Sequence, residues 1–180
     1  GPWKDGRDLA EIVDQVNRLQ PDIVAITGDM VDAPIEQAGS DTAVLTRLEA
    51  PVFFVTGNHE YYWGGPLWVD FLRRLGIDVL EGEMRMIRKG EGRVLVAGVP
   101  DPVVRQFGLP SNLDPPAWTD DGEPPDVRVL LAHRPEVAYR AAQAGFDLQL
   151  SGHTHGGQFF PLTLLIDFFQ PFPRGLNRVE

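Results

Sequence analysis

Residues 21–32, Pro-Asp-Ile-Val-Ala-Ile-Thr-Gly-Asp-Met-Val-Asp, decide the fold class of this 180-residue chain. The apolar run over 22–27 predicts a buried strand, because short apolar runs bounded by turn residues are typical of parallel sheets. It leads directly into Gly-Asp-Met-Val-Asp at 28–32, which places carboxylates at the strand's carboxyl end. Upstream, residues 7–19 have apolar positions at helical spacing. A helix followed by such a strand indicates an α/β architecture.

The same alternation continues along the chain and predicts an α/β sandwich. Further helices are expected over about 41–49, over 66–75 and from Pro135, a residue favoured at the first helical position. Further strands are expected over 52–56, 77–80, 84–88, 93–97, 127–132 and 147–150. Residues 110–126 hold five prolines and five acidic residues, which predicts a solvated loop or insertion within one domain spanning 1–180.

Composition narrows the classes of function. The net charge of −10 argues against general nucleic-acid binding, which normally needs a basic surface. Such acidity fits either a solvated acidic surface or carboxylates that are neutralised by cations. The absence of cysteine excludes disulfides and thiolate metal sites, which leaves nitrogen and oxygen ligands. No apolar run reaches the roughly 18 residues of a membrane-spanning helix.

Potential metal ligands follow four of the predicted strands. Strand 22–27 precedes Asp29 and Asp32, strand 52–56 precedes Asn58 and His59, strand 127–132 precedes His133, and strand 147–150 precedes His153 and His155. Ligands collect beyond the carboxyl ends of strands in open α/β sheets, so these loops are expected to converge. A single histidine is more often a surface or core residue than a ligand. All four histidines of the chain lie in these loops, however, and this favours a shared site.

The residue types in these loops suit cation binding. In an extended segment, His153 and His155 would point from the same face, where they could serve one ion each or share an ion. The carboxylate of Asp29 offers two oxygens, which is enough to bridge two cations. Asn58 adds an amide oxygen, which suits hard or borderline ions.

The series Gly-Asp-Met-Val-Asp, Gly-Asn-His-Glu, Ala-His and Gly-His-Thr-His resembles the calcineurin-like metallophosphoesterase superfamily. Its pattern is D-x-H, GDxxD, GNH[DE], a later His and GHxH, and four of the five blocks match in order between residues 28 and 155. The motifs GNHEYYWG (residues 57–64) and GHTHGGQ (residues 152–158) are similar to those of a bacterial branch whose members are often membrane-tethered or exported. The resemblance implies a layered αββα sandwich and leaves the localisation of the full-length protein open.

The resemblance also assigns roles to individual residues. It implies that Asp29 bridges two divalent ions (Mn, Fe or Zn), that Asn58, His133 and His153 complete one shell, and that His155 belongs to the other. His59 would be the general acid beside the scissile phosphate, and Asp32 would support the site. The D-x-H block is absent before Gly1. The site of the ion assigned to His155 is therefore expected to be incomplete, and the domain is expected to be truncated at both ends.

The expected reaction is hydrolysis of a phosphomonoester or phosphodiester by a metal-bridging hydroxide, with proton donation by His59. The alternatives are a different metal-dependent hydrolase and a catalytically impaired metal-binding domain. Tyr61 and Tyr62 are candidates for substrate binding, with packing on the rim of the core as the equal alternative. The apolar stretch 159–169 fits either a lipid-linked substrate or, more readily, packing within the full domain.

Overall fold

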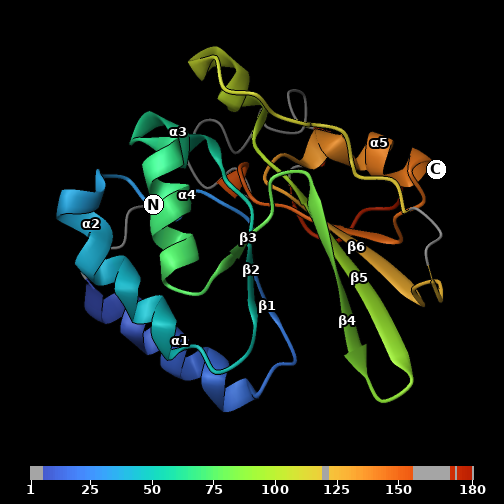
Figure 1. Ribbon diagram of the computed structural model, residues 1–180, viewed down its shortest axis with the longest axis horizontal. Coiled ribbons are helices and arrows are strands. Elements are labelled where there is room, and N and C mark those ends of the chain that lie inside the picture. Colours follow the sequence, from blue (N-terminus) through green and yellow to red (C-terminus); the bar gives the residue numbers. More distant parts are fainter. Residues whose placement is uncertain (1–5, 119–121, 156–170, 173, 180) are drawn as a thin grey trace.

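The computed structural model describes residues 6–118, 122–155, 171–172 and 174–179. Seven strands form two sheets, and helices cover the outer face of each sheet (Figure 1). The three-stranded sheet is parallel in the order β1-β2-β3 and consists of β1 (Val24–Ile26), β2 (Val52–Phe54) and β3 (Asp78–Val79). The four-stranded sheet has the order β4-β5-β6-β7 and consists of β4 (Glu83–Lys89), β5 (Gly92–Val99), β6 (Val127–Ala132) and β7 (Leu148–Leu150).

Helices on the outside of the three-stranded sheet bury its first face. They are α1 (Gly6–Leu19), α2 (Ile35–Thr42), the short 3-10 helix η1 (Ala43–Arg47) and α4 (Gly65–Arg74). Phe54 points toward these helices and packs with Val13 of α1 and Leu72 of α4. Because side chains alternate along a strand, the neighbouring Phe53 points the opposite way, toward the second sheet.

The helix expected at 41–49 was misplaced: a regular helix covers Ile35–Thr42, and only a 3-10 turn follows it.

The two sheets pack face to face. Phe53, Val55 and Leu80 from one sheet contact Val96, Val129 and Leu131 from the other, and all six are buried. Gly98 permits this approach, because a Cβ there would lie 2.5 Å from side-chain atoms of both Leu80 and Val55. The molecule is therefore an αββα sandwich, as the sequence predicts.

The outer face of the four-stranded sheet packs under α5 (Ala138–Gln143), which follows the 3-10 helix η3 (Pro135–Val137). Strands β5, β6 and β7 are parallel, while β4 pairs with β5 as an antiparallel hairpin closed at Gly90. Two further short elements lie near the upper edge in Figure 1: α3 (Asn58–Tyr62) and the 3-10 helix η2 (Pro102–Phe107). The sequence pattern predicts neither, because each is a short element without a full apolar period.

Two segments singled out in the sequence lie partly or wholly outside the described residues. The acidic segment 110–126 has no helix or strand in its described part, residues 110–118 and 122–126. The apolar stretch 159–169 lies outside the described residues, and with it the question of a lipid-facing surface. Across the parts of the chain that are described, every helix is too short or too polar to cross a membrane.

Candidate metal centre

The carboxyl ends of β1, β2, β6 and β7 meet at one place, and each supplies a loop to it. The loops after β6 and β7 are tied together by a hydrogen bond from the Gly152 N–H to the His133 carbonyl, at 3.1 Å. The loops after β1 and β2 meet through Gly28 and Gly57, where a Cβ on Gly28 would lie 2.3 Å from the Gly57 nitrogen. Backbone contacts therefore hold the loops of each sheet together, and the four loops converge as the sequence predicts.

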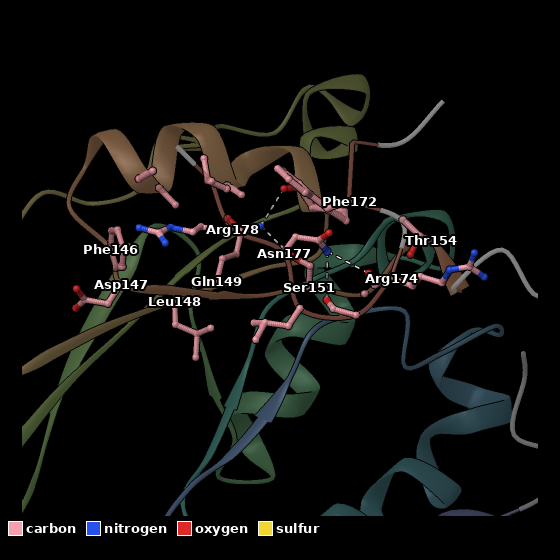
Figure 2. A pocket seen from close by; sticks show the side chains of 18 residues that line it. Phe146, Asp147, Leu148, Gln149, Ser151, Thr154, Phe172, Arg174, Asn177 and Arg178 are labelled. Atoms are coloured by element: carbon pink, nitrogen blue, oxygen red, sulfur yellow. Dashed lines mark hydrogen bonds between the residues drawn. The ribbon is translucent and has the colours of Figure 1, made fainter. Parts of the chain in front are cut away.

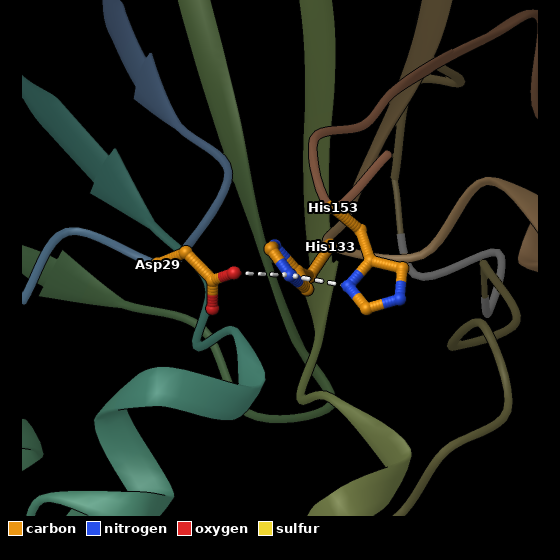
Figure 3. A group of neighbouring side chains, drawn as sticks. All are labelled: Asp29, His133 and His153. Atoms are coloured by element: carbon orange, nitrogen blue, oxygen red, sulfur yellow. Dashed lines mark hydrogen bonds and ion pairs between the residues drawn. The ribbon is translucent and has the colours of Figure 1, made fainter. Parts of the chain in front are cut away.

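Four donor atoms form a continuous group at this convergence. Asp29 Oδ2 lies 3.1 Å from His133 Nε2, which lies 3.2 Å from His153 Nδ1, which in turn lies 3.1 Å from Asn58 Oδ1. Figure 3 shows Asp29, His133 and His153 pointing toward one another from separate strands. Among the described residues, these three make up the one group of acidic and histidine side chains compact enough to share an ion, with ligand atoms within 4.8 Å.

The hydrogen bonds around this group leave electron pairs facing each other. His133 is fully buried, and its Nδ1 lies 2.6 Å from the Thr27 carbonyl, to which it donates. Neutral His133 therefore presents an unprotonated Nε2 to the carboxylate of Asp29, so two acceptors stand 3.1 Å apart. Either a proton or a cation must lie between them. A donor set of one carboxylate, one amide and two imidazoles fits a transition-metal ion such as Mn, Fe or Zn.

The pKa values of Asp29, His133 and His153 reflect the closeness of these side chains. Burial opposes ionisation of Asp29, but hydrogen bonding and charge from His133, together with the His59 N–H, lower its pKa to about 2. Burial also opposes protonation of His133, yet the bond to Asp29 raises the pKa of this histidine. The pKa of His153 is lowered by burial and by the positive charges of Arg134 and His133. Asp29 is thus held as an anion, and His153 is held neutral, the form that binds metals.

Glu60 holds two of the loops together, a role that the sequence analysis does not assign to it. Its side chain is fully buried and accepts hydrogen bonds from the backbone N–H groups of Gly57, Asp29 and Met30, at 2.6, 3.0 and 2.7 Å. Asp29 has φ of 55°, a left-handed conformation that costs energy for a non-glycine residue, so these bonds help to maintain it. The available signal was its position three residues after Gly57, where a capping glutamate is expected.

His59 lies beside the donor group and is not part of it. Its Nδ1 hydrogen bonds to Asp32 Oδ1, and its Nε2 lies 3.8 Å from Asp29 Oδ2. The ring is partly exposed, and the exposed ring of Tyr62 lies 5.9 Å from it. Tyr61 is only 3% exposed, and its hydroxyl hydrogen bonds to Thr56 at 3.0 Å. Of the two tyrosines, Tyr62 alone is exposed.

His155 differs from the other histidines of the loops. It is exposed and does not join the donor group. The expected extended geometry of the last motif is wrong, because His153 and His155 have φ of 66° and 50° in place of strand values. Left-handed backbone at both positions removes the alternation that would put the two side chains on one face.

A cavity of about 700 Å³ lies next to this centre, between β7, α5 and the C-terminal residues Phe172 and 174–179 (Figure 2). The loop after β7 contributes Ser151, Gly152 and Thr154 to its wall, but none of the four donor side chains lines it. The cavity therefore shares the loop after β7 with the donor group but is a separate site.

Comparisons with known proteins agree with the family that the sequence motifs resemble. The family model described as calcineurin-like phosphoesterase matches residues 5–157. The "Transmembrane protein with metallophosphoesterase domain" of Danio rerio is 34% identical over the whole chain, which spans 43% of that protein. An "Uncharacterized metallophosphoesterase" of Aquifex aeolicus is 37% identical over 85% of the chain, which aligns with 58% of that protein. The chain thus spans only part of these relatives, and a vertebrate among them means that the bacterial resemblance assigns no organism.

Solved structures support the fold. A 5'-nucleotidase precursor from Thermus thermophilus superposes with a TM-score of 0.56 at 20% identity, covering 81% of this chain and 35% of that chain. The identity is low, so the similarity concerns the arrangement of the layers and strands.

Proposed function

This chain belongs to the calcineurin-like phosphoesterase family, and we propose that its donor group binds one of two divalent ions in a phosphoesterase active site. Metal-dependent hydrolysis of phosphoesters is the general activity of this family. The observation that carries the proposal is the group Asp29, Asn58, His133 and His153, with His59 beside it. The second ion would share Asp29 and take His155 as a ligand.

The chemistry divides between the ions and the side chains. Bound divalent ions supply Lewis acidity, which neutralises phosphoryl charge and makes water a better nucleophile. His59 donates a proton to the leaving oxygen as the phosphorus–oxygen bond breaks. Asp32 accepts the Nδ1 proton of His59, so Nε2 is the nitrogen that faces the site and transfers its proton. Glu60 keeps the loops that bear Asp29 and Asn58 in register.

The proposal is tested by metal content and turnover together. With Mn²⁺ added, the wild-type protein should bind metal and hydrolyse bis(p-nitrophenyl) phosphate or p-nitrophenyl phosphate. His133→Ala and His153→Ala should each lose tight metal binding and turnover. Arg140→Met is the matched control, because Arg140, on α5, forms an exposed ion pair with Asp114 and is not part of the donor group.

The outcomes separate the proposal from its alternatives. Wild-type metal content in both histidine variants would show that the ligand assignment is wrong. A metal-loaded wild-type protein that hydrolyses neither ester would favour a metal-binding domain without catalysis. Hydrolysis of carboxylic esters or amides in place of phosphoesters would indicate the other class of metal hydrolase.

A further inference from the structure

Arg134 follows the buried His133 directly, and its guanidinium is held by the carboxylate of Asp101, a residue that is 1% exposed. Arg134 Nε lies 2.8 Å from Asp101 Oδ2, and Nη2 lies 3.3 Å from Asp101 Oδ1. These bonds use two of its three nitrogens, and none of the described residues pairs with Nη1. The arginine is thus fixed in orientation, and in the described part of the chain one edge of its donor fork carries no partner.

The guanidinium of Arg134 belongs to the residue next to the donor His133. After burial, the charge of Arg134 is the next cause that lowers the pKa of His153. Tyr62 also interacts electrostatically with Arg134, and its ring lies near that of His59, with centroids 5.9 Å apart. Its side chain is 26% exposed, so solvent and ligands reach it.

Local folding alone does not account for Asp101. Its Oδ1 accepts a hydrogen bond from the Val103 N–H at 2.8 Å and so begins η2. An asparagine would supply the same acceptor without burying a charge. A buried ion pair adds little net stability, since the desolvation of both ions offsets their attraction. What the pair does provide is an arginine with a fixed geometry.

A fixed cation would offset the negative charge that surrounds the site. The centre presents the carboxylates of Asp29 and Asp32, and the whole chain carries a net charge of −10, both of which repel an anionic substrate. A guanidinium forms paired, charge-assisted hydrogen bonds with phosphate oxygens. Resting on the phosphoesterase function proposed above, we propose that Arg134 is a phosphate-binding residue, with Nη1 donating to the scissile phosphate or to a phosphate attached to it.

The test measures binding apart from catalysis. Inorganic phosphate and pyrophosphate are titrated into the Mn²⁺-loaded protein by calorimetry, and KM and kcat are measured for bis(p-nitrophenyl) phosphate. Arg134→Met should weaken anion binding about 10- to 100-fold, the range for a lost charge-assisted bond. KM should rise with little change in kcat if the contact is equally strong in ground and transition states. Arg134→Lys should restore part of the affinity, and Arg140→Met should change nothing.

A second variant covers the possibility that an unpaired Asp101 unfolds the protein. The double variant Asp101→Asn/Arg134→Met removes both charges and keeps an acceptor for the Val103 N–H, and circular dichroism confirms that it is folded. Loss of affinity for both anions assigns the contact to the scissile phosphate, whereas loss for pyrophosphate alone assigns it to an attached phosphate. Unchanged affinity for both anions in the folded double variant overturns the inference. Because the anion titrations need no turnover, they remain decisive even if the proposed hydrolysis fails.

Discussion

His59 and Asp32 form a pair in which one residue faces the chemistry and the other fixes its orientation. Asp32 lies in the loop after β1 and His59 at the start of α3, so the hydrogen bond between them joins that loop to the helix. The free Nε2 is directed toward Asp29 without belonging to the donor group. At this scale, the proposed ligands and the proposed proton donor are separate residues, and substitution can distinguish them.

His59→Ala should retain metal yet lose turnover, most severely for substrates with poor alkoxide leaving groups. General acid catalysis contributes about 10²–10⁴-fold, and a leaving group of low pKa needs little of it. Rates for alkyl and p-nitrophenyl esters, measured with metal content, check this expectation. An equal loss across leaving groups would indicate that His59 positions the substrate and does not donate a proton.

At the scale of elements, the site depends on the contact between the loops after β1 and β2. Gly28 has φ of +86°, and a Cβ there would lie 2.3 Å from the Gly57 nitrogen and 2.9 Å from His133 Nδ1. The obstructing nitrogen belongs to backbone that Glu60 already holds, so it cannot move aside without disturbing Asp29. Loop geometry, and not the ligand residues alone, therefore determines whether the donor atoms meet.

Gly28→Ala should abolish tight metal binding and destabilise the protein. Gly76→Ala is the matched control, because Gly76 has φ of +84° but a Cβ added there would meet nothing within 4 Å. Both substitutions carry the strain of a left-handed alanine, and Gly28→Ala adds an overlap that costs about 1–3 kcal/mol more. Urea unfolding and metal titration measure the difference. Equal destabilisation with intact metal binding in both variants would contradict the role given to this contact.

At the scale of the whole molecule, the centre joins the two sheets. Asp29 and Asn58 follow strands of the three-stranded sheet, whereas His133 and His153 follow strands of the four-stranded sheet. An ion bound by all four residues would link both layers at one end of the sandwich. A ligand that binds only the folded state raises its stability by mass action.

Mn²⁺ at about 100 times its Kd should raise Tm by about 5–10 °C, from roughly 2.7 kcal/mol of linkage in a domain of this size. His133→Ala should abolish the shift, while His59→Ala should retain it because His59 is not a proposed ligand. Differential scanning calorimetry with and without chelator checks both. A full shift in His133→Ala would place the ion elsewhere.

The sequence by itself determined the α/β sandwich class and the convergence of four ligand-bearing loops, and the resemblance of its motifs to a known family implied the layer order. Apolar runs at 22–27, 52–56 and 127–132 specify strands, and each run ends at a potential ligand, so strand position and site position follow from one local pattern. The strand at 22–27 is only half-buried, whereas β2 and most of β6 are buried. The helix near residue 41 was misplaced because Ile35–Thr42 has a weak apolar period and takes its position from packing on α4 and α1.

Only the tertiary structure decided which side chains meet. The left-handed backbone at Asp29, His153 and His155 and the burial of Tyr61 depend on contacts between residues distant in the sequence. The same holds for Glu60, which binds N–H groups 30 and 31 residues away, and for Arg134, whose partner Asp101 lies 33 residues earlier. A sequence pattern reports local preference, whereas the conformations of these loops are fixed by hydrogen bonds that form only when distant strands have paired and brought their loops together.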